Sequence, residues 1–209
     1  MKRRSKRKIA VSATTALTLA IFIIAFANKL FGDKFRSTLA PAAPDFDKTQ
    51  DFVKIMDVGQ ADAALIYSNG CSAVIDAGLT SSADDISADL KGADIKDIDA
   101  LLITHLHMDH AGALAKIAMS FPIDNLIIPN RDSSAEAMPT VNEAEKRVVA
   151  EKGKVFTATE GMNFNIGEFE VTLLAYFPDA TKENDRSVIS SFSRVTPRKQ
   201  PKQTYWQKS

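Results

Sequence analysis

The sequence contains only one cysteine, Cys71, among its 209 residues. A single thiol cannot form an intramolecular disulfide, which excludes a small scaffold held together by disulfide bonds. Cys71 lies in an apolar, strand-like run and is expected to be a small buried hydrophobic side chain rather than a nucleophile or a metal ligand. The chain, of which 45% is hydrophobic, is instead long enough for one domain that is stabilised by its core.

Acidic residues are absent from both ends of the chain. Residues 2–8 contain six basic residues and residues 186–209 contain another six, while the formal net charge of the chain is zero. Subtracting these twelve from the 26 basic residues leaves 14 in residues 9–185, against all 26 acidic residues, so this body has a net charge near −12. Such a body offers no basic groove that holds nucleic acid by charge alone, although a bound metal ion would supply local positive charge.

Charged residues are also absent from residues 9–27, directly after the basic residues 1–8. About 20 apolar residues span a bilayer, and a basic flank stays on the cytoplasmic side. Residues 9–27 are therefore predicted to be a retained transmembrane anchor or a cleavable signal peptide, because Ala25-Phe26-Ala27 has the small-x-small pattern of a cleavage site. Both interpretations place the rest of the chain outside the cytoplasmic membrane, as a single-pass membrane protein or a secreted one.

The rest of the chain divides by composition and periodicity. Residues 28–51 mix charges with two prolines of an Ala-Pro-Ala-Ala-Pro run, a composition typical of a linker. Residues 190–209 are predicted to be a polar basic tail, which is more often solvated than bound to nucleic acid or anionic lipid. Between them, residues 52–189 change from the strand period to the helical period and back, which favours a layered α/β sandwich.

The expected strands and helices follow from these periods. Ser68-Asn69-Gly70 predicts a hairpin turn, and Gly153 predicts the end of a helix. Strands are expected at residues 52–58, 63–67, 71–75, 98–104, 125–128, 154–158, 163–166 and 168–176. Helices are expected at residues 81–90, 111–120 and 141–152.

Histidine is scarce and unevenly distributed, because the chain has three histidines, His105, His107 and His110, within six residues. Histidine is the commonest protein ligand of zinc, and side chains two residues apart at the end of a strand point to the same side. His105 and His107 are therefore expected to bind one metal ion. Asp109 and His110 follow where the chain turns into a helix and can face a second ion about 3.5–4 Å away. A chance cluster or an adventitious surface site is the less favoured alternative.

Three segments resemble one family. Thr-His-Leu-His-Met-Asp-His-Ala-Gly at residues 104–112 resembles the His-x-His-x-Asp-His motif of the metallo-β-lactamase superfamily. Residues 56–63 and 74–78 resemble the Asp-Val-Gly-Gln-Gly-Asp and Ile-Asp-Ala-Gly segments of one branch, which includes the extracellular hydrolase-like domain of bacterial DNA-uptake competence channel proteins. The resemblance covers residues 52–189 and implies an αββα sandwich of the α/β class, preceded here by the N-terminal membrane or signal helix.

The resemblance implies a zinc-dependent hydrolase with two zinc ions in an intact site. His105 and His107 would be ligands of the first ion, and Asp109 and His110 ligands of the second. Asp109 would also be central to catalysis. A phosphodiester substrate such as DNA, and a role in DNA uptake, are implied only by the likeness to the competence branch.

The resemblance gives a role to two further aspartates of the matching segments. The resemblance implies that Asp57 and Asp76 support the metal loop, since metal ligands are oriented by hydrogen bonds from surrounding groups. Capping of local turns explains either aspartate equally well.

The end of the chain departs from the family pattern. The family continues with further strands, a Gly-Asp whose carboxylate bridges the two metal ions, and later histidines. This sequence has no histidine after His110 and no acidic residue after Asp185. We therefore expect that the C-terminal part of the domain is missing, as in a frameshifted or truncated product. Two protein ligands for each metal would bind zinc weakly, so a catalytically inactive remnant or binding module is the alternative to an active hydrolase.

Overall fold

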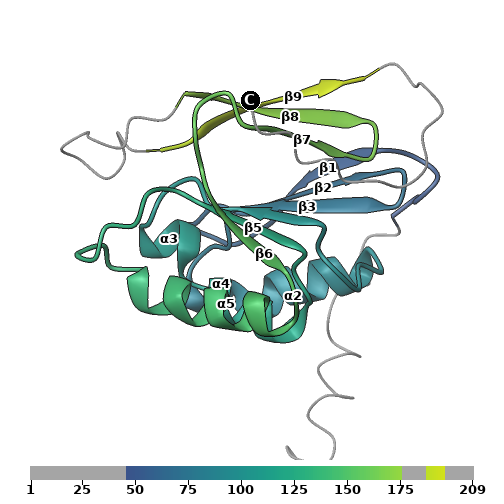
Figure 1. Cartoon of the computed structure of the whole chain (residues 1–209). Coiled ribbons are helices and arrows are strands. Elements are labelled where there is room, and N and C mark those ends of the chain that lie inside the picture. The colour runs from purple at the N-terminus through teal and green to yellow at the C-terminus, as the bar shows by residue number, and fades with distance from the viewer. Residues whose placement is uncertain (1–45, 176–186, 196–209) are drawn as a thin grey trace, which may run out of the picture. The chain divides into compact units, whose positions relative to one another are not determined.

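The computed structural model describes residues 46–175 and 187–195 (Figure 1). The described residues form a six-stranded sheet, a three-stranded sheet and a layer of helices. The predicted anchor or signal peptide at residues 9–27, most of the predicted linker and the last residues of the predicted tail lie outside this part of the chain. Within residues 46–175 and 187–195, no helix is long and apolar enough to cross a membrane.

The six-stranded sheet has the strand order β1-β2-β3-β4-β5-β6. The first three strands are antiparallel neighbours, and the next three join in parallel through helical crossovers. A two-residue turn, Asn69-Gly70, connects β2 and β3, and both residues have positive φ angles (48° and 82°), as the predicted hairpin requires. The strands are β1 (Phe52–Ile55), β2 (Ala64–Ser68), β3 (Cys71–Ile75), β4 (Ala100–Leu102), β5 (Asn125–Ile128) and β6 (Lys154–Thr157).

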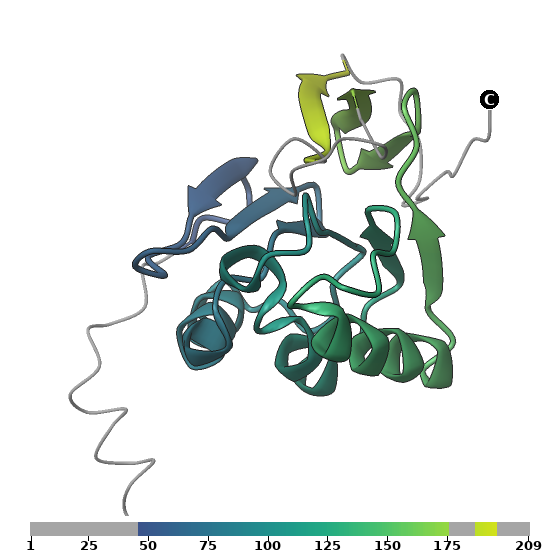
Figure 2. The ribbon, with the colours of Figure 1, turned by 90° about the vertical axis from the view of Figure 1, so that its left-hand side faces the viewer.

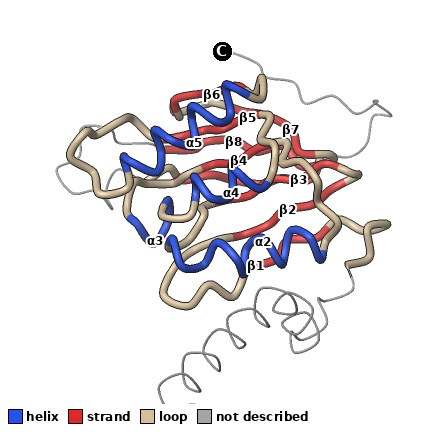
Figure 3. Tube along the Cα trace, turned by 90° about the horizontal axis from the view of Figure 1, so that it is seen from below, coloured by secondary structure: helices blue, strands red, loops and turns tan. Residues whose placement is uncertain are grey.

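Helices cover one face of the six-stranded sheet (Figure 3). Their apolar sides pack on the sheet in one hydrophobic core, in which Ile86, Leu114 and Val141 are fully buried. The longest helix ends at Ala150, before the predicted end, and Lys152 rather than Gly153 has the left-handed conformation that follows it (φ 70°), while the N–H of Gly153 donates to the carbonyl of Val148. The helices are η1 (Thr80–Ser82), α2 (Ala83–Gly92), α3 (Met108–Ala111), α4 (Leu114–Ser120) and α5 (Met138–Ala150).

The three-stranded sheet lies over the other face of the six-stranded sheet (Figure 2). A second hydrophobic core between the sheets buries Phe164, Val171 and Leu173 against Ile66 and Leu102. The described residues therefore show helix, sheet and sheet in that order, which are three of the four layers of an αββα sandwich. The strands are β7 (Asn163–Ile166), β8 (Phe169–Ala175) and β9 (Ile189–Arg194), in that order and antiparallel.

Several predicted boundaries differ from the structure, and two of the differences have a clear structural cause. The domain was predicted to end at residue 189, but β9 continues to Arg194, because pairing with β8 and the contact between Arg194 and Glu168 stabilise a serine-rich segment as a strand. The helix predicted at residues 111–120 is divided into α3 and α4, and α4 begins only at Leu114. Between them, Gly112 lies against backbone atoms of Met108 and Gly78, so that a side chain would not fit there.

The absence of a side chain at one glycine allows the two sheets to approach each other closely. Gly167, in the turn between β7 and β8, has a φ of 56°, and a Cβ atom there would lie 2.1 Å from the backbone oxygen of Ser68 in the other sheet. Gly161 has a similar φ of 79° but has open space around the same position. Alanine variants at the two positions therefore separate the effect of a left-handed backbone from the effect of steric crowding against Ser68.

We predict that Gly167→Ala destabilises the chain by about 1–3 kcal/mol more than Gly161→Ala does, because only the first variant adds a steric clash to the strain of the left-handed backbone. Urea unfolding of the full chain, followed by circular dichroism, measures the two free energies of unfolding. Equal losses in both variants would contradict close packing of this turn against β2.

Candidate metal centre

The histidine loop begins where β4 ends. β3 and β4 are parallel neighbours, so the segments that follow them, at Asp76 and Thr104, lie at the same edge of the sheet. Asp76 has a φ of 59°, an unusual conformation for a residue other than glycine. Its N–H donates to the carbonyl of Leu102, which holds this turn against β4. Polar residues of two chain segments are thus brought together at one sheet edge.

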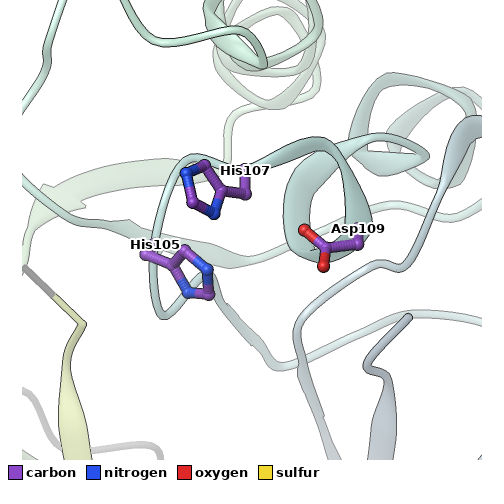
Figure 4. A group of neighbouring side chains, drawn as sticks. All are labelled: His105, His107 and Asp109. Carbon is purple, nitrogen blue, oxygen red and sulfur yellow. The ribbon is translucent and has the colours of Figure 1, made fainter. Parts of the chain in front are cut away.

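Three predicted metal ligands converge beyond this edge. His105 and His107 lie in the loop and Asp109 lies in α3, and Figure 4 shows their side chains facing one another. One donor atom of each lies within 4.8 Å of the others. His105 is 6% exposed, whereas Asp109 keeps 46% of its side chain exposed. Two imidazole nitrogens and a carboxylate oxygen form a donor set that suits a divalent cation such as zinc, so the residues present fit a metal ion.

A buried aspartate organises the loop behind these ligands. Asp76 is 4% exposed, and its carboxylate accepts hydrogen bonds of 2.8 Å each from the N–H and the hydroxyl of Thr104. The Nδ1 atom of His110 lies 2.8 Å from the same carboxylate. With its Nδ1 proton donated to Asp76, His110 presents Nε2 on the opposite side of the ring. Asp76 therefore contacts both the start of the histidine loop and one predicted ligand, His110.

Thr104 links Asp76 to the first histidine, and the sequence had not suggested this role. The Thr104 hydroxyl donates its proton to Asp76 and lies 3.2 Å from Nδ1 of His105. Because a hydroxyl has one proton, its oxygen is left to accept a hydrogen bond from Nδ1–H of His105. This arrangement leaves Nε2 of His105 as the nitrogen that can bind a metal ion.

The two most closely packed histidine rings have opposite pKa shifts. The ring centroids of His105 and His110 are 3.8 Å apart. Burial lowers the pKa of His105, and the neighbouring His110 lowers it further, so His105 favours the neutral form that binds metals. Burial also opposes protonation of His110, but the hydrogen bond that His110 donates to Asp76 and the charges of Asp76, Asp109 and Asp62 outweigh it and raise the pKa of His110.

The remaining predicted residue, Asp57, is not brought into the cluster. It is exposed and makes no hydrogen bond or ion pair with the residues that the structure describes. Asp62, five residues later, lies there instead, with its Oδ2 atom 3.3 Å from Nε2 of His110. The sequence did contain a signal for it, because Asp62 is the second of the two aspartates in the segment that resembles Asp-Val-Gly-Gln-Gly-Asp.

We predict that His105 and His110 titrate on opposite sides of pH 6.5 in the metal-free chain, because burial dominates for His105 and the carboxylates dominate for His110. The raised pKa of His110 means that its pairing stabilises the fold below pH 6.5 and that this contribution is lost as the pH rises through the raised value. NMR of the ring protons in the presence of a chelator measures both pKa values.

The chain has three histidines in all, so single histidine-to-glutamine variants assign every ring signal. A lower pKa for His110 than for His105 would contradict the hydrogen-bond arrangement around Asp76.

Comparison with known proteins identifies the family of this fold and site. The sequence model of the metallo-beta-lactamase superfamily matches residues 56–172. The anti-Pycsar protein Apyc1 of Paenibacillus sp. (strain J14) is 38% identical over 55 residues, which are 26% of this chain and 21% of that protein. This chain thus spans about a fifth of that relative.

Solved structures show the same architecture. MEM-A1, a subclass B3 metallo-beta-lactamase isolated from a soil metagenome library, superposes with a TM-score of 0.52 at 20% identity, over 69% of this chain and 55% of that one. A B3 metallo-beta-lactamase with an active-site glutamic acid gives a TM-score of 0.50 at 19% identity, over 76% and 59% of the two chains. This chain spans less than two thirds of either, and identities this low show the fold alone. With the family model covering more than half of the sequence, the chain belongs to the metallo-β-lactamase superfamily.

Proposed function

We propose that this chain is a zinc-dependent hydrolase that acts on a phosphodiester, such as DNA, outside the cytoplasmic membrane. The observation that supports this most is the convergence of His105, His107 and Asp109, whose donor atoms lie within 4.8 Å of one another. Members of this superfamily are generally metal-dependent hydrolases, and the donor set here suits zinc. A bound divalent cation would lower the pKa of a water molecule and polarise the scissile group.

We assign the metal-binding, catalytic and positioning roles to individual side chains. Burial keeps His105 in its neutral form, and Thr104 leaves its Nε2 available. Asp109 is within reach of a substrate, since 46% of its side chain is exposed. We therefore assign to Asp109 the catalytic role of contacting both the cation and the reacting groups, and to Asp76 the positioning of His110.

The phosphodiester class rests on the likeness of residues 56–63 and 74–78 to the competence branch, together with the charge of the chain. A phosphate would approach a body with a net charge near −12, so it requires local positive charge at the point of reaction. A cation in the histidine loop supplies that charge within an acidic domain. A role in DNA uptake would follow from the same likeness.

We predict that the full chain binds zinc and hydrolyses bis(4-nitrophenyl) phosphate, and that His105→Ala combined with His107→Ala removes both properties, because two of the three converging donors are lost. Equilibrium dialysis with elemental analysis measures the zinc, and release of 4-nitrophenol measures turnover. Circular dichroism checks that the double variant stays folded.

A chromogenic cephalosporin serves as the comparison substrate in the same assay. Hydrolysis of the cephalosporin alone would overturn the proposed substrate class. Equal zinc in the wild type and the double variant would overturn the ligand assignment, and zinc binding without any turnover would favour a non-catalytic binding module.

The proposed location rests on residues 1–27, a basic segment followed by an uncharged apolar one. We predict that the chain is found in the membrane fraction, or secreted, with residues 52–189 accessible to protease from outside the cytoplasmic membrane. Protease treatment of spheroplasts measures this accessibility. Replacing Leu19 and Ile23 by lysine should keep the chain inside, because charges in the apolar segment oppose insertion. Protection of the unmodified chain in intact spheroplasts would contradict an external location.

A further inference from the structure

We propose that Asp62 is a ligand of a second cation, which it binds together with Asp109 and His110. This inference rests on the proposed function, because it adds a donor to the same metal centre. Its starting point is a contact that the histidine motif does not contain. The Oδ2 atom of Asp62 lies 3.3 Å from Nε2 of His110, and Oδ2 of Asp109 lies 3.9 Å from the same nitrogen.

These separations suit donors that share one ion. Two ligand atoms at about 2.0–2.1 Å from a tetrahedral zinc ion are about 3.3 Å from each other. The pair formed by Asp62 and His110 has this spacing. The oxygen of Asp109 is slightly farther away at 3.9 Å, and its side chain is 46% exposed, so it has room to rotate towards the same point.

His110 is held in the orientation that such a site requires. Its Nδ1 atom is engaged by the buried carboxylate of Asp76 at 2.8 Å, so Nε2 faces the other two carboxylates. Metal-binding histidines commonly donate their second ring N–H to a carboxylate in this way. An imidazole nitrogen with two carboxylate oxygens is a donor set that suits zinc or manganese.

Backbone hydrogen bonds hold Asp62 on both sides of its Cα atom. Its N–H donates to the carbonyl of Asp109 at 3.1 Å, and its carbonyl accepts a hydrogen bond from the N–H of Gly78 at 2.9 Å. The residue is therefore held between α3 and the turn that contains Asp76. Its side chain is 70% exposed, so the carboxylate is open to a cation from solvent. In residues 46–175 and 187–195, no lysine or arginine forms an ion pair with it.

Asp62 changes the number of protein ligands that are available to the second ion. The sequence alone offered two protein ligands for each metal ion, but Asp62 raises the second set to three. With Asp109 contributing one oxygen to each ion, the sets become His105, His107 and Asp109 for the first and Asp62, Asp109 and His110 for the second. Three protein ligands and an open position are what catalytic zinc sites commonly have.

The test compares Asp62→Asn with Asp97→Asn in the full chain. Asp97 is an exposed aspartate that precedes β4, whereas the histidine loop follows this strand, so the control removes the same charge at the opposite end of the strand. Zinc binding is measured by equilibrium dialysis with elemental analysis over a range of free zinc. Asp62→Glu, which keeps the carboxylate, is the rescue variant, and urea unfolding checks the fold of all three.

We expect the wild type and Asp97→Asn to bind two zinc ions per chain. Asp62→Asn should bind the first ion unchanged and the second on the order of 10–100-fold more weakly, with partial recovery in Asp62→Glu. Unchanged affinity for every bound ion in Asp62→Asn would overturn the inference and leave the contact with His110 as an ion pair, while the proposed function would stand. No zinc binding by the wild type would overturn both.

Discussion

The structure of the site depends on one buried carboxylate, that of Asp76. A buried charge is costly unless hydrogen bonds compensate for its lost hydration, and here the N–H of Thr104, the hydroxyl of Thr104 and Nδ1 of His110 all contact it at 2.8 Å. These contacts join the turn after β3 to the loop after β4 and to α3, which is 34 residues away along the chain. The left-handed backbone of Asp76 persists because its N–H is bonded to Leu102 and the N–H of Ala77 to His110. The predicted metal ligands are therefore positioned by a buried carboxylate behind them.

Much of the fold could be predicted because its signals are local. The strands at residues 71–75, 125–128 and 163–166 have the predicted bounds, since each is a short apolar or alternating run between turn residues. The errors occur where a distant partner decides the structure. β9 contains Ser190, Ser191 and Ser193, which locally favour a loop, but its backbone is paired with β8. The strand expected at residues 98–104 is shorter at its end because Thr104 turns towards Asp76 instead of continuing the ladder. Local composition could not predict these long-range hydrogen bonds.

In the candidate site, too, the residues with local signals could be predicted and those placed by long-range contacts could not. His105, His107 and Asp109 could be predicted because their spacing is local, and the structure brings them together. Asp57 and Asp62 could not be ranked from sequence, because their directions are set by a turn with Gly59 at a φ of 69° and by hydrogen bonds to residues far along the chain. The N–H of Asp62 donates to Asp109, which places its carboxylate at His110 and leaves Asp57 in solvent. A motif thus identified the family, while the tertiary contacts of a neighbouring loop decide which acidic residue completes the cluster.

The charges of the cluster imply that a bound cation would stabilise the fold. Asp62, Asp76 and Asp109 all lie within 3.9 Å of a nitrogen of His110, in a domain that is already acidic. One protonated imidazole offsets part of the repulsion among three carboxylates, and this is why the pKa of His110 is raised despite its burial. A divalent cation offsets more of it, since it carries two charges and contacts the ligand atoms directly. Because the ligands come from separate segments, a cation that binds the folded arrangement also stabilises that arrangement. The carboxylates that make the loop suitable for a metal ion therefore also repel one another when no ion is bound. The buried hydrogen bonds of Asp76 hold the loop in place against this repulsion.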